Sequence, residues 1–234
     1  MILAAIFIVV NGAKGISAVQ LSRTIGCDYK TAFVLAHKLR EAMASEYEGV
    51  TLDGEVHADG LYVGGKIRPA NLKKNRRDRR LAQNQNGQRR VVVVARQFHG
   101  NRTLTTVVRA EADGIEFVKS RVAEGAEVYA DEASHWDDLH AHYKVWRVNH
   151  SEFYSFDGRH TNYAESFFSR LRNMFRGTHH HVSPDRVHAY ACHAAWLEDH
   201  RDQDNYSLIR SLLGLTLTTP VTRTWKGYWQ RRRI

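Results

Sequence analysis

Apolar and polar residues alternate along several short stretches of the chain, and this period of two predicts β-strands. The first stretch spans residues 56–65, and two runs rich in β-branched residues follow at 91–95 and 103–108. A turn that contains Gly, at residues 99–101, separates these two runs as in a hairpin. The pattern therefore predicts three consecutive antiparallel strands.

Two shorter apolar runs, at residues 126–130 and 145–148, predict a fourth and a fifth strand. Between and after these runs, apolar residues recur every three or four positions, which predicts helices over residues 114–123, 134–143 and 160–176. A further amphipathic helix after Ser183 would cover the sheet with Val187, Tyr190, Ala191, Ala194 and Leu197. This order of elements predicts an α/β fold with a mixed sheet flanked by helices.

Residues 15–43 show the pattern of two helices joined by a tight turn. Ser17 can cap the first helix and Asp28 the second. Apolar residues of the second helix recur at helical spacing, and its other faces carry Lys30, Lys38 and Arg40. Two interpretations stay open: an ordinary helical hairpin, and a helix-turn-helix whose second helix enters a DNA major groove. The basic region downstream favours the DNA-binding interpretation.

The remaining stretches suggest how the chain is divided. Residues 1–10 are apolar, but they are about half as long as a bilayer span, so we expect a buried helix and no membrane association. A polar boundary that contains Gly follows at residues 46–54. We therefore expect a helix-turn-helix segment over residues 1–48, a catalytic α/β domain over 49–205 and a basic C-terminal tail over 206–234.

Charge narrows the class of partner. The chain has 34 Lys and Arg against 25 Asp and Glu, and this formal charge of +9 favours an anionic partner such as nucleic acid. Residues 66–90 alone contain ten Lys and Arg and one acid, so they cannot form an apolar core. Only two Cys occur, without metal-ligand spacing, which excludes a disulfide framework and fits a reducing cytoplasm. We expect a phosphate-binding arm with Lys73, Lys74, Arg76, Arg77, Arg79 and Arg80.

Polar residues on three predicted elements are candidates for catalysis. Asp59 lies within the first strand, Asp131 ends the fourth, and the helix over 160–176 presents Asn162, Glu165, Ser169 and Arg172 on one face. Taken singly, Asp131 could cap a helix and the polar face could be a solvated stripe. Taken together, oxygen ligands from three elements suit Mg²⁺ or Mn²⁺, and two such ions about 4 Å apart support phosphoryl transfer.

The motifs around these residues resemble those of the IS1595-family insertion-sequence transposases, also called ISXO2-like. The resemblance covers about residues 14–200. The matching residues are Lys14-Gly15-Ile16-Ser17-Ala18 with Gln20-Leu21, Asp59 with Tyr62-Val63-Gly64-Gly65-Lys66, Asp131, His160-Thr161-Asn162 with Glu165 and Phe167, and, after Arg172, Gly177-Thr178-His179-His180-His181-Val182-Ser183.

This resemblance implies a ribonuclease-H-like catalytic domain of the DDE type. It implies cleavage of DNA strands at the ends of an insertion sequence and their direct transfer to target DNA, without a covalent enzyme intermediate. Asp59 and Asp131 would be the first ligands of a two-metal site for Mg²⁺ or Mn²⁺. DNA would be the partner, a homo-oligomer would synapse two ends, and the protein would act in the bacterial cytoplasm, at the nucleoid.

Asn162 and Glu165 both remain candidates for the third ligand. Asn162 is the position that the family motif names, whereas Glu165 follows Asp131 after 33 intervening residues and its carboxylate binds Mg²⁺ better than an amide. Arg172 stands where the family usually has Lys and would keep a cation for phosphate. Three successive His cannot all face one ion, so we expect the loop around His180 to touch DNA or the rim of the active site.

The chain departs from the family pattern in two places. Gly60 stands where relatives often have Glu beside the first Asp, so an auxiliary acid at that position is lost. Relatives usually begin with a Cys-rich zinc ribbon, and its absence here implies a late start of the reading frame or a decayed element. Two alternatives therefore stay open: a non-catalytic DNA-binding protein derived from a transposase, and a metal-dependent nuclease on the same fold.

Overall fold

The strands form one mixed sheet in the order β3-β2-β1-β4-β5 within the described residues. β1 pairs antiparallel with β2 and parallel with β4, β2 pairs antiparallel with β3, and β4 pairs parallel with β5. This arrangement confirms the predicted mixed sheet and is consistent with a ribonuclease-H-like domain. The strands are β1 Glu55–Val63, β2 Arg90–Gln97, β3 Thr103–Val108, β4 Glu127–Asp131 and β5 Lys144–Val148.

The structure is a computed structural model. It describes residues 1–65, 67, 69–78, 81–84, 86–131, 134–148 and 162–230. The end of the expected basic C-terminal tail, residues 231–234, lies outside the described residues.

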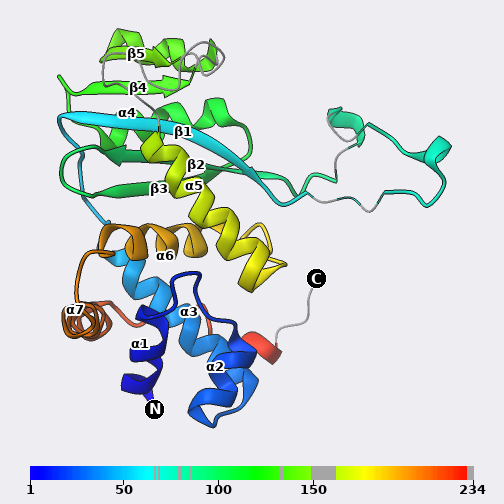
Figure 1. Ribbon diagram of the computed structural model, residues 1–234, viewed down its shortest axis with the longest axis vertical. Coiled ribbons are helices and arrows are strands. Elements are labelled where there is room, and N and C mark those ends of the chain that lie inside the picture. Colours follow the sequence, from blue (N-terminus) through cyan, green and yellow to red (C-terminus); the bar gives the residue numbers. More distant parts are fainter. Residues whose placement is uncertain are drawn as a thin grey trace.

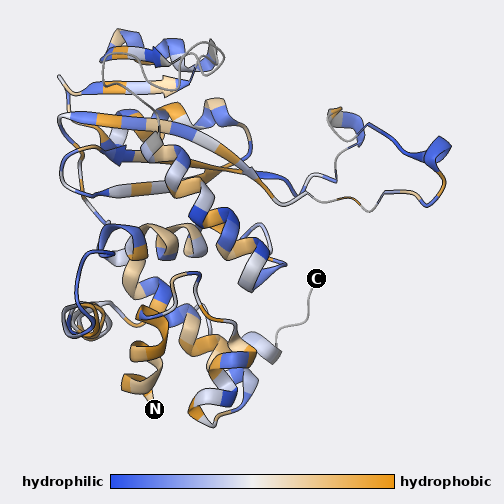
Figure 2. Cartoon of the chain, viewed as in Figure 1, coloured by the Kyte–Doolittle hydropathy of each residue, from blue (hydrophilic) through white to orange (hydrophobic). Residues whose placement is uncertain are grey.

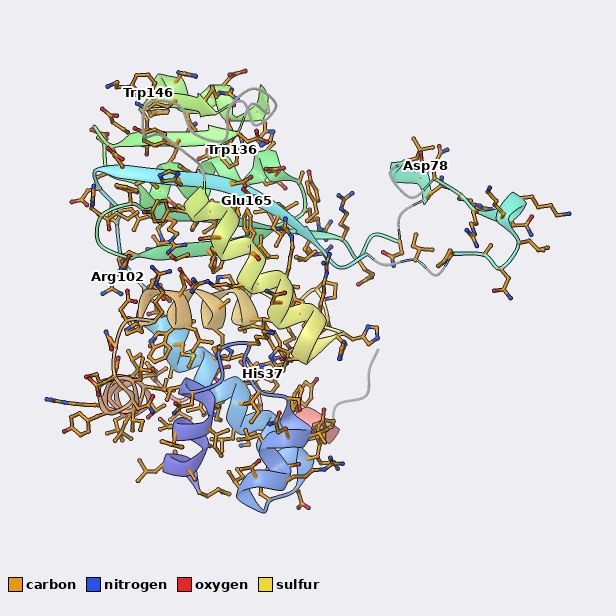
Figure 3. The ribbon with its side chains drawn as sticks, viewed as in Figure 1. His37, Asp78, Arg102, Trp136, Trp146 and Glu165 are labelled. Carbon is orange, nitrogen blue, oxygen red and sulfur yellow. The ribbon has the colours of Figure 1, made fainter. Side chains whose placement is uncertain are left out.

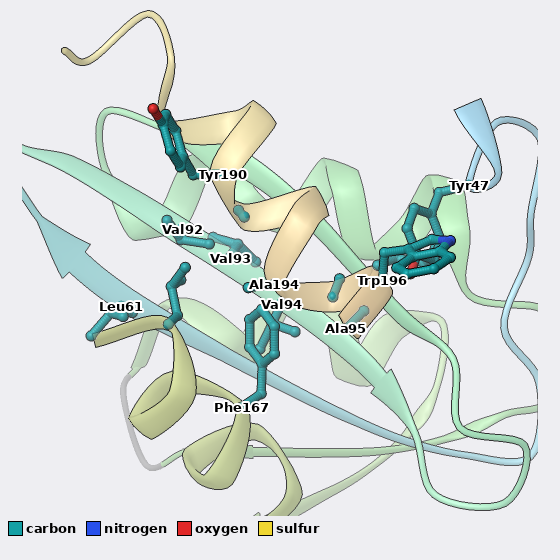
Figure 4. Packing of buried hydrophobic residues seen from close by; sticks show 14 of the residues in the cluster. Tyr47, Leu61, Val92, Val93, Val94, Ala95, Phe167, Tyr190, Ala194 and Trp196 are labelled. Carbon is teal, nitrogen blue, oxygen red and sulfur yellow. The ribbon is translucent and has the colours of Figure 1, made fainter. Parts of the chain in front are cut away.

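Helices cover both faces of the sheet (Figure 1). Helices α5 (Asn162–Met174) and α6 (Val187–Asp199) lie on one face, and α4 (Ile115–Arg121) lies on the other. β2 is therefore buried on both sides, which explains why residues 91–95 form an unbroken apolar run and do not alternate. Figure 4 shows Phe167 of α5 and Ala194 of α6 packed beside the valines of β2.

The N-terminal helices pack together below α6 (Figure 1). They are α1 (Ile2–Val10), α2 (Ala18–Ile25) and α3 (Tyr29–Ser45). Ser17 caps α2 by accepting a hydrogen bond from the Gln20 N–H at 3.1 Å, as predicted. Gly26 ends α2 with φ of +69°, a left-handed conformation that favours Gly and makes the tight turn into α3.

Three elements differ from the prediction. α1 is buried on one side only, because Ile2, Leu3 and Phe7 stay more than half exposed. The segment predicted as a helix over residues 134–143 is a 3-10 helix, η4 (Ser134–Ala141). Residues predicted to start a C-terminal tail form α7 (Asn205–Thr218), which packs against α1 and α3 and buries Leu212 completely.

A buried ion pair connects the sheet to the two helices that cover it. The Arg96 guanidinium of β2 donates to Glu198 of α6 at 2.7 Å, and both side chains are almost fully buried. Its other terminal nitrogen donates to the Tyr163 carbonyl at 2.8 Å and to the Ser166 hydroxyl at 3.2 Å, both on α5. Glu198 also pairs with Arg170 of α5. We name this set, Arg96, Glu198, Tyr163, Ser166 and Arg170, the buried clamp.

We expect the substitution Glu198→Ala to lower the free energy of unfolding by about 3–5 kcal/mol, because it leaves the Arg96 charge buried without its carboxylate partner. Urea unfolding followed by circular dichroism measures this loss. The control is Glu116→Ala, which removes an exposed pair with Lys119 and should cost less than about 1 kcal/mol. Equal losses in the two variants would show that the buried pair does not stabilise the fold.

Candidate active site

Asp59 and Asp131 lie side by side on the adjacent strands β1 and β4. β1 and β4 are parallel with Ala58 in register with Ala130, and each Asp follows one residue later. Residues in register on adjacent parallel strands point to the same face, and such strands are roughly 4.8 Å apart. Oδ1 of Asp59 also accepts a hydrogen bond from the Gly60 N–H at 2.6 Å. The fold thus brings together the two carboxylates that the sequence analysis paired.

Arg147 of β5 binds the backbone at the end of β4. One of its terminal nitrogens donates to the carbonyl oxygen of Asp131 at 2.8 Å, and the other pairs with Asp137 of η4. Burial lowers the pKa of His135 in the same 3-10 helix, and the Arg147 charge lowers it further. The last residue of β4 is therefore held in place by a cation from the neighbouring strand.

Aromatic side chains fix the start of α5 over the same face of the sheet. His57 precedes Asp59 by two residues and Tyr129 precedes Asp131 by two, so all four share that face. The His57 ring stacks on Tyr129 with centroids 5.0 Å apart, and Tyr163 of α5 lies 5.6 Å from His57. The first turn of α5 therefore faces the strands that carry the two Asp residues.

Both candidates for the third ligand belong to this first turn. α5 begins at Asn162, and Glu165 is exposed within the first turn. Figure 3 shows Glu165 at the end of α5 that crosses β1. The Asn162 side chain and the preceding His160 and Thr161 lie outside the described residues. Among the residues that are described, no three His, Cys, Asp or Glu side chains are grouped closely enough to hold a metal ion.

Arg172 is not brought to the carboxylate pair. It lies ten residues beyond Asn162 on α5, which places it about 15 Å further along the helix axis. Its side chain is exposed, and its guanidinium lies 6.0 Å from the centre of the Phe168 ring.

Glu111 is an acid near the site that the sequence analysis missed. It begins the 3-10 helix η3 (Glu111–Gly114), and a Cβ atom at Gly60 would overlap its carboxylate. Burial raises the pKa of Glu111, a hydrogen bond from Tyr62 lowers it, and the nearby Asp131 charge raises it. The sequence does contain one signal for this contact, which is Gly60. A Gly within a strand often marks a close approach of another group.

The basic arm connects the end of β1 to the start of β2 and projects from the sheet (Figure 1). Residues 71–78 are all exposed, and Figure 2 shows the arm as predominantly hydrophilic. Lys73 and Lys74 lie in a 3-10 turn, followed by Arg76 and Arg77. Lys66, Arg79 and Arg80 lie outside the described residues.

Helix α3 does not present a free face to DNA along its length. Lys30 is exposed in the first turn, but beyond Thr31 every residue of α3 is buried or half-buried. Arg40 is 3% exposed, and its guanidinium lies 4.2 Å from the centre of the Tyr190 ring. Arg40 is therefore a core residue, which corrects its expected role in DNA contact. Lys38 is half-buried, because α2, α6 and α7 surround this helix.

The three consecutive His follow the far end of α5, where the π-helical turn Phe175–His179 begins the loop. His179 points inward: its ring lies 4.6 Å from Tyr190, and a Cβ on Gly15 would come within 2.9 Å of its Nε2. The motifs around Gly15 and His179 therefore meet in the fold. The His180 side chain is exposed. It lies about 25 Å from the start of α5, measured along the helix axis, so this loop is not at the rim of the active site.

Buried histidines gather where α3, α6 and this loop meet. The rings of His37 and His179 both lie against Tyr190, at 5.6 and 4.6 Å. Burial, together with the charge of the adjacent Arg40, lowers the pKa of each of these two His to about 3. His193 of α6 is fully buried, and its pKa is lowered well below the usual value by the same causes. These side chains are neutral at physiological pH.

A comparison with protein families identifies the α/β part of the chain. The model of the ISXO2-like transposase domain matches residues 51–199, which include Asp59, Asp131, Asn162 and Glu165. This chain belongs to the ISXO2-like transposase family. The match extends from before β1 to the end of α6, so the sheet and its covering helices are the transposase domain. Comparisons with curated proteins and with solved structures give no match.

Membership in this family makes the chain a DNA transposase in the general sense, and DNA its partner. The family comprises polynucleotidyl transferases of the DDE type, which generally use divalent metal ions. Within the part of the transposase that the structure describes, no helix has both the length and the apolar character needed to cross a membrane.

We expect acid to destabilise the transposase through its buried histidines. The folded pKa of His37 lies below its unfolded value near 6.5, so its contribution to stability is present above pH 6.5 and is lost as pH falls toward 3. Between pH 7.5 and 5.5 this one group should remove about 1.4 kcal/mol. Urea unfolding of wild type and His37→Phe at both pH values tests this expectation. Phe can retain the stacking of the His37 ring on Trp225, whose centre lies 4.5 Å away. An equal loss in both proteins would contradict it.

Proposed function

We propose that this transposase cleaves DNA strands at the ends of an insertion sequence and joins them to target DNA, in a reaction that requires Mg²⁺ or Mn²⁺. The main support for the proposal is the position of two carboxylates. Asp59 and Asp131 occupy matching positions on the adjacent parallel strands β1 and β4, on the face that the start of α5 covers. Phosphoryl transfer assisted by metal ions needs carboxylate ligands that rigid elements hold in place, and two neighbouring strands provide such elements.

The donor set fits a hard divalent cation. Two carboxylates on neighbouring strands repel each other, and a cation between them relieves the repulsion. Asp59 and Asp131 would supply two oxygen ligands, and the Asn162 amide or the Glu165 carboxylate would supply the third. When bound, Mg²⁺ or Mn²⁺ would polarise the scissile phosphate and the attacking oxygen.

The reaction consists of two displacements at phosphorus. In the first, a water oxygen forms a bond to phosphorus while the bond to the 3′ oxygen breaks, which leaves a free 3′ hydroxyl. In the second, this hydroxyl attacks a phosphodiester of target DNA, so one P–O bond forms as another breaks. Asp59 and Asp131 would hold the metal ions at the scissile phosphate. Arg172, the exposed His180 and the basic arm would bind phosphates further along the DNA.

Joining two ends to one target requires that both ends be held at the same time. We therefore include in the proposal a homo-oligomer that synapses the two ends, with one active site acting on each. The substrates are the terminal repeats of the element and the target DNA, which places the reaction at the nucleoid in the bacterial cytoplasm.

Strand cleavage of a labelled duplex that carries the terminal repeats tests the proposal. Wild type with Mg²⁺ or Mn²⁺ should nick the repeat ends and join them to target DNA, whereas chelator should abolish both steps. Asp59→Asn and Asp131→Asn should each reduce cleavage by roughly 100-fold or more, because an amide is a poorer ligand than a carboxylate. Binding of the duplex by these variants serves as the control for folding.

The same assay assigns the third ligand. Asn162→Ala and Glu165→Ala are compared with Ser169→Ala, which lies on the same face of α5 one turn further along. The ligand variant should lose cleavage as Asp59→Asn does, and the other two should stay within a few-fold of wild type. Nicking without joining would instead favour the nuclease, and DNA binding without nicking would favour the non-catalytic protein.

The arm should contribute to DNA affinity through its charge. Replacing Lys74, Arg76 and Arg77 by Gln should reduce the slope of log affinity against log salt concentration by about 3, because each phosphate contact releases roughly 0.9 counterions. Titration of duplex DNA at several salt concentrations measures the slope. A control variant of the same net charge has Gln at Arg109, Lys144 and Arg210. Equal slopes in the two variants would show that the arm does not contact phosphate.

A further inference from the structure

The last part of the described chain folds back along α3 (Figure 1). Residues 222–230, which we name the C-terminal strap, contact one stripe of this helix. The stripe consists of residues spaced by four, which lie on one side of a helix: Tyr29, Phe33, His37 and Glu41. The strap therefore completes the packing of α3 on a side that the other helices leave open.

Trp225 anchors the strap. Its Nε1 donates to Oε1 of Glu41 at 2.7 Å, and the Thr222 hydroxyl donates to Oε2 of the same carboxylate at 3.0 Å. The His37 ring stacks on the indole with centroids 4.5 Å apart, and the Arg186 guanidinium lies 4.1 Å from the ring centre. Trp225 is accordingly only 6% exposed.

Trp229, unlike Trp225, is partly exposed to solvent. Its aromatic neighbours Tyr29, Phe33 and Tyr228 meet it at interplanar angles of 61°, 63° and 83°, so none of them stacks parallel to the indole. Trp229 remains 44% exposed and Tyr29 45% exposed, with their ring centres 6.1 Å apart. The strap thus holds a large aromatic ring rigidly at the surface without covering it.

One cation borders the exposed Trp229 ring, and a second lies against its neighbour Tyr228 and pairs with Asp185. The Lys30 ammonium lies 5.7 Å from the centre of the Trp229 ring, and Arg186 lies 5.2 Å from the centre of Tyr228 beneath it. The rings stand at the first turn of α3, the one part of this helix that is exposed. An exposed aromatic surface with a Lys beside it suits a ligand that combines flat rings with phosphates.

We propose that Tyr29, Lys30 and Trp229 form a stacking site for the unpaired bases of single-stranded DNA. A base stacks on the exposed part of the Trp229 indole, and Lys30, which lies over this ring, contacts the adjoining phosphate. Bases within a duplex already stack on each other, so the site selects strands that are open, as at a DNA end. The inference takes DNA as the ligand from the proposed function but needs neither metal ions nor the carboxylate pair.

Fluorescence anisotropy of a labelled oligothymidylate, measured in chelator, tests the site on the full chain. Trp229→Ala should bind the single strand about tenfold more weakly, in the range found for loss of one stacked base. The matched control is Tyr206→Ala, which removes another exposed aromatic ring, 72% exposed on α7, and should bind as wild type does. Affinity for a blunt duplex should change less than twofold in both variants.

A second variant asks whether the strap positions the ring. Glu41→Ala removes both hydrogen bonds that anchor the strap while keeping Trp229, and it should also weaken single-strand binding several-fold. Unfolding midpoints of both variants near that of wild type would confirm that the folds are intact. The proposal is overturned if Trp229→Ala binds the single strand as wild type does, if it loses duplex affinity equally, or if Glu41→Ala has no effect.

This test separates the stacking site from the catalytic proposal. The carboxylate pair lies on the sheet and the stacking site on α3, so cleavage by wild type and single-strand binding by Trp229→Ala test the two proposals independently. If wild type does not cleave the repeat ends with Mg²⁺ or Mn²⁺ but binds the single strand in a way that Trp229→Ala weakens, the catalytic proposal alone is rejected. Normal cleavage with binding that is insensitive to Trp229→Ala would reject the stacking site alone.

Discussion

The position of α5 depends on the buried charge of Arg96. A guanidinium inside the protein is stable only when its donors and its charge are satisfied, and here Glu198, the Tyr163 carbonyl and the Ser166 hydroxyl do so together. Because these partners belong to two helices, the ion pair fixes α5 and α6 on the same face of the sheet. The first turn of α5, with Asn162 and Glu165, is held by the same contacts.

The parallel pairing of β1 and β4 supplies the other half of the site. A one-residue shift in this register would turn one Asp away from the other, so the contacts at the strand ends matter for chemistry. Arg147 holds the Asp131 backbone, and the Gly60 N–H holds the Asp59 carboxylate. On the opposite face of β1, Glu111 occupies the space that a side chain at Gly60 would need, which places a third acid near the pair.

The structure narrows how the N-terminal helices could contact DNA. The pattern of residues 15–43 predicts two helices and a turn, and the structure has them. However, α3 is enclosed by α2, α6, α7 and the C-terminal strap, and only its first turn is open to DNA. The first turn of α3 is the part of a recognition helix that contacts bases, so a helix-turn-helix that uses this turn stays open.

The sequence by itself determined the local elements and the family. Periodic apolar residues predicted the strands and most helices, the density of Lys and Arg predicted the exposed arm, and the motifs around Asp59 and Asp131 indicated an ISXO2-like transposase. These signals are local, because strand and helix periodicity, turn residues and charge density act over a few neighbouring positions. Even the error at residues 134–143 is local, since 3-10 and α-helices share similar patterns.

Only the tertiary structure decided which side chains meet. Glu111 reaches Gly60, His179 reaches Gly15 and Trp225 reaches Glu41 across long separations in sequence, and no periodicity encodes such contacts. The same reason explains Arg40: its place in the helical pattern suggests a solvent-facing cation, but α6 packs there and buries it against Tyr190. Whether a side chain on a helix is buried depends on which other elements pack against that helix, and the complete fold decides this.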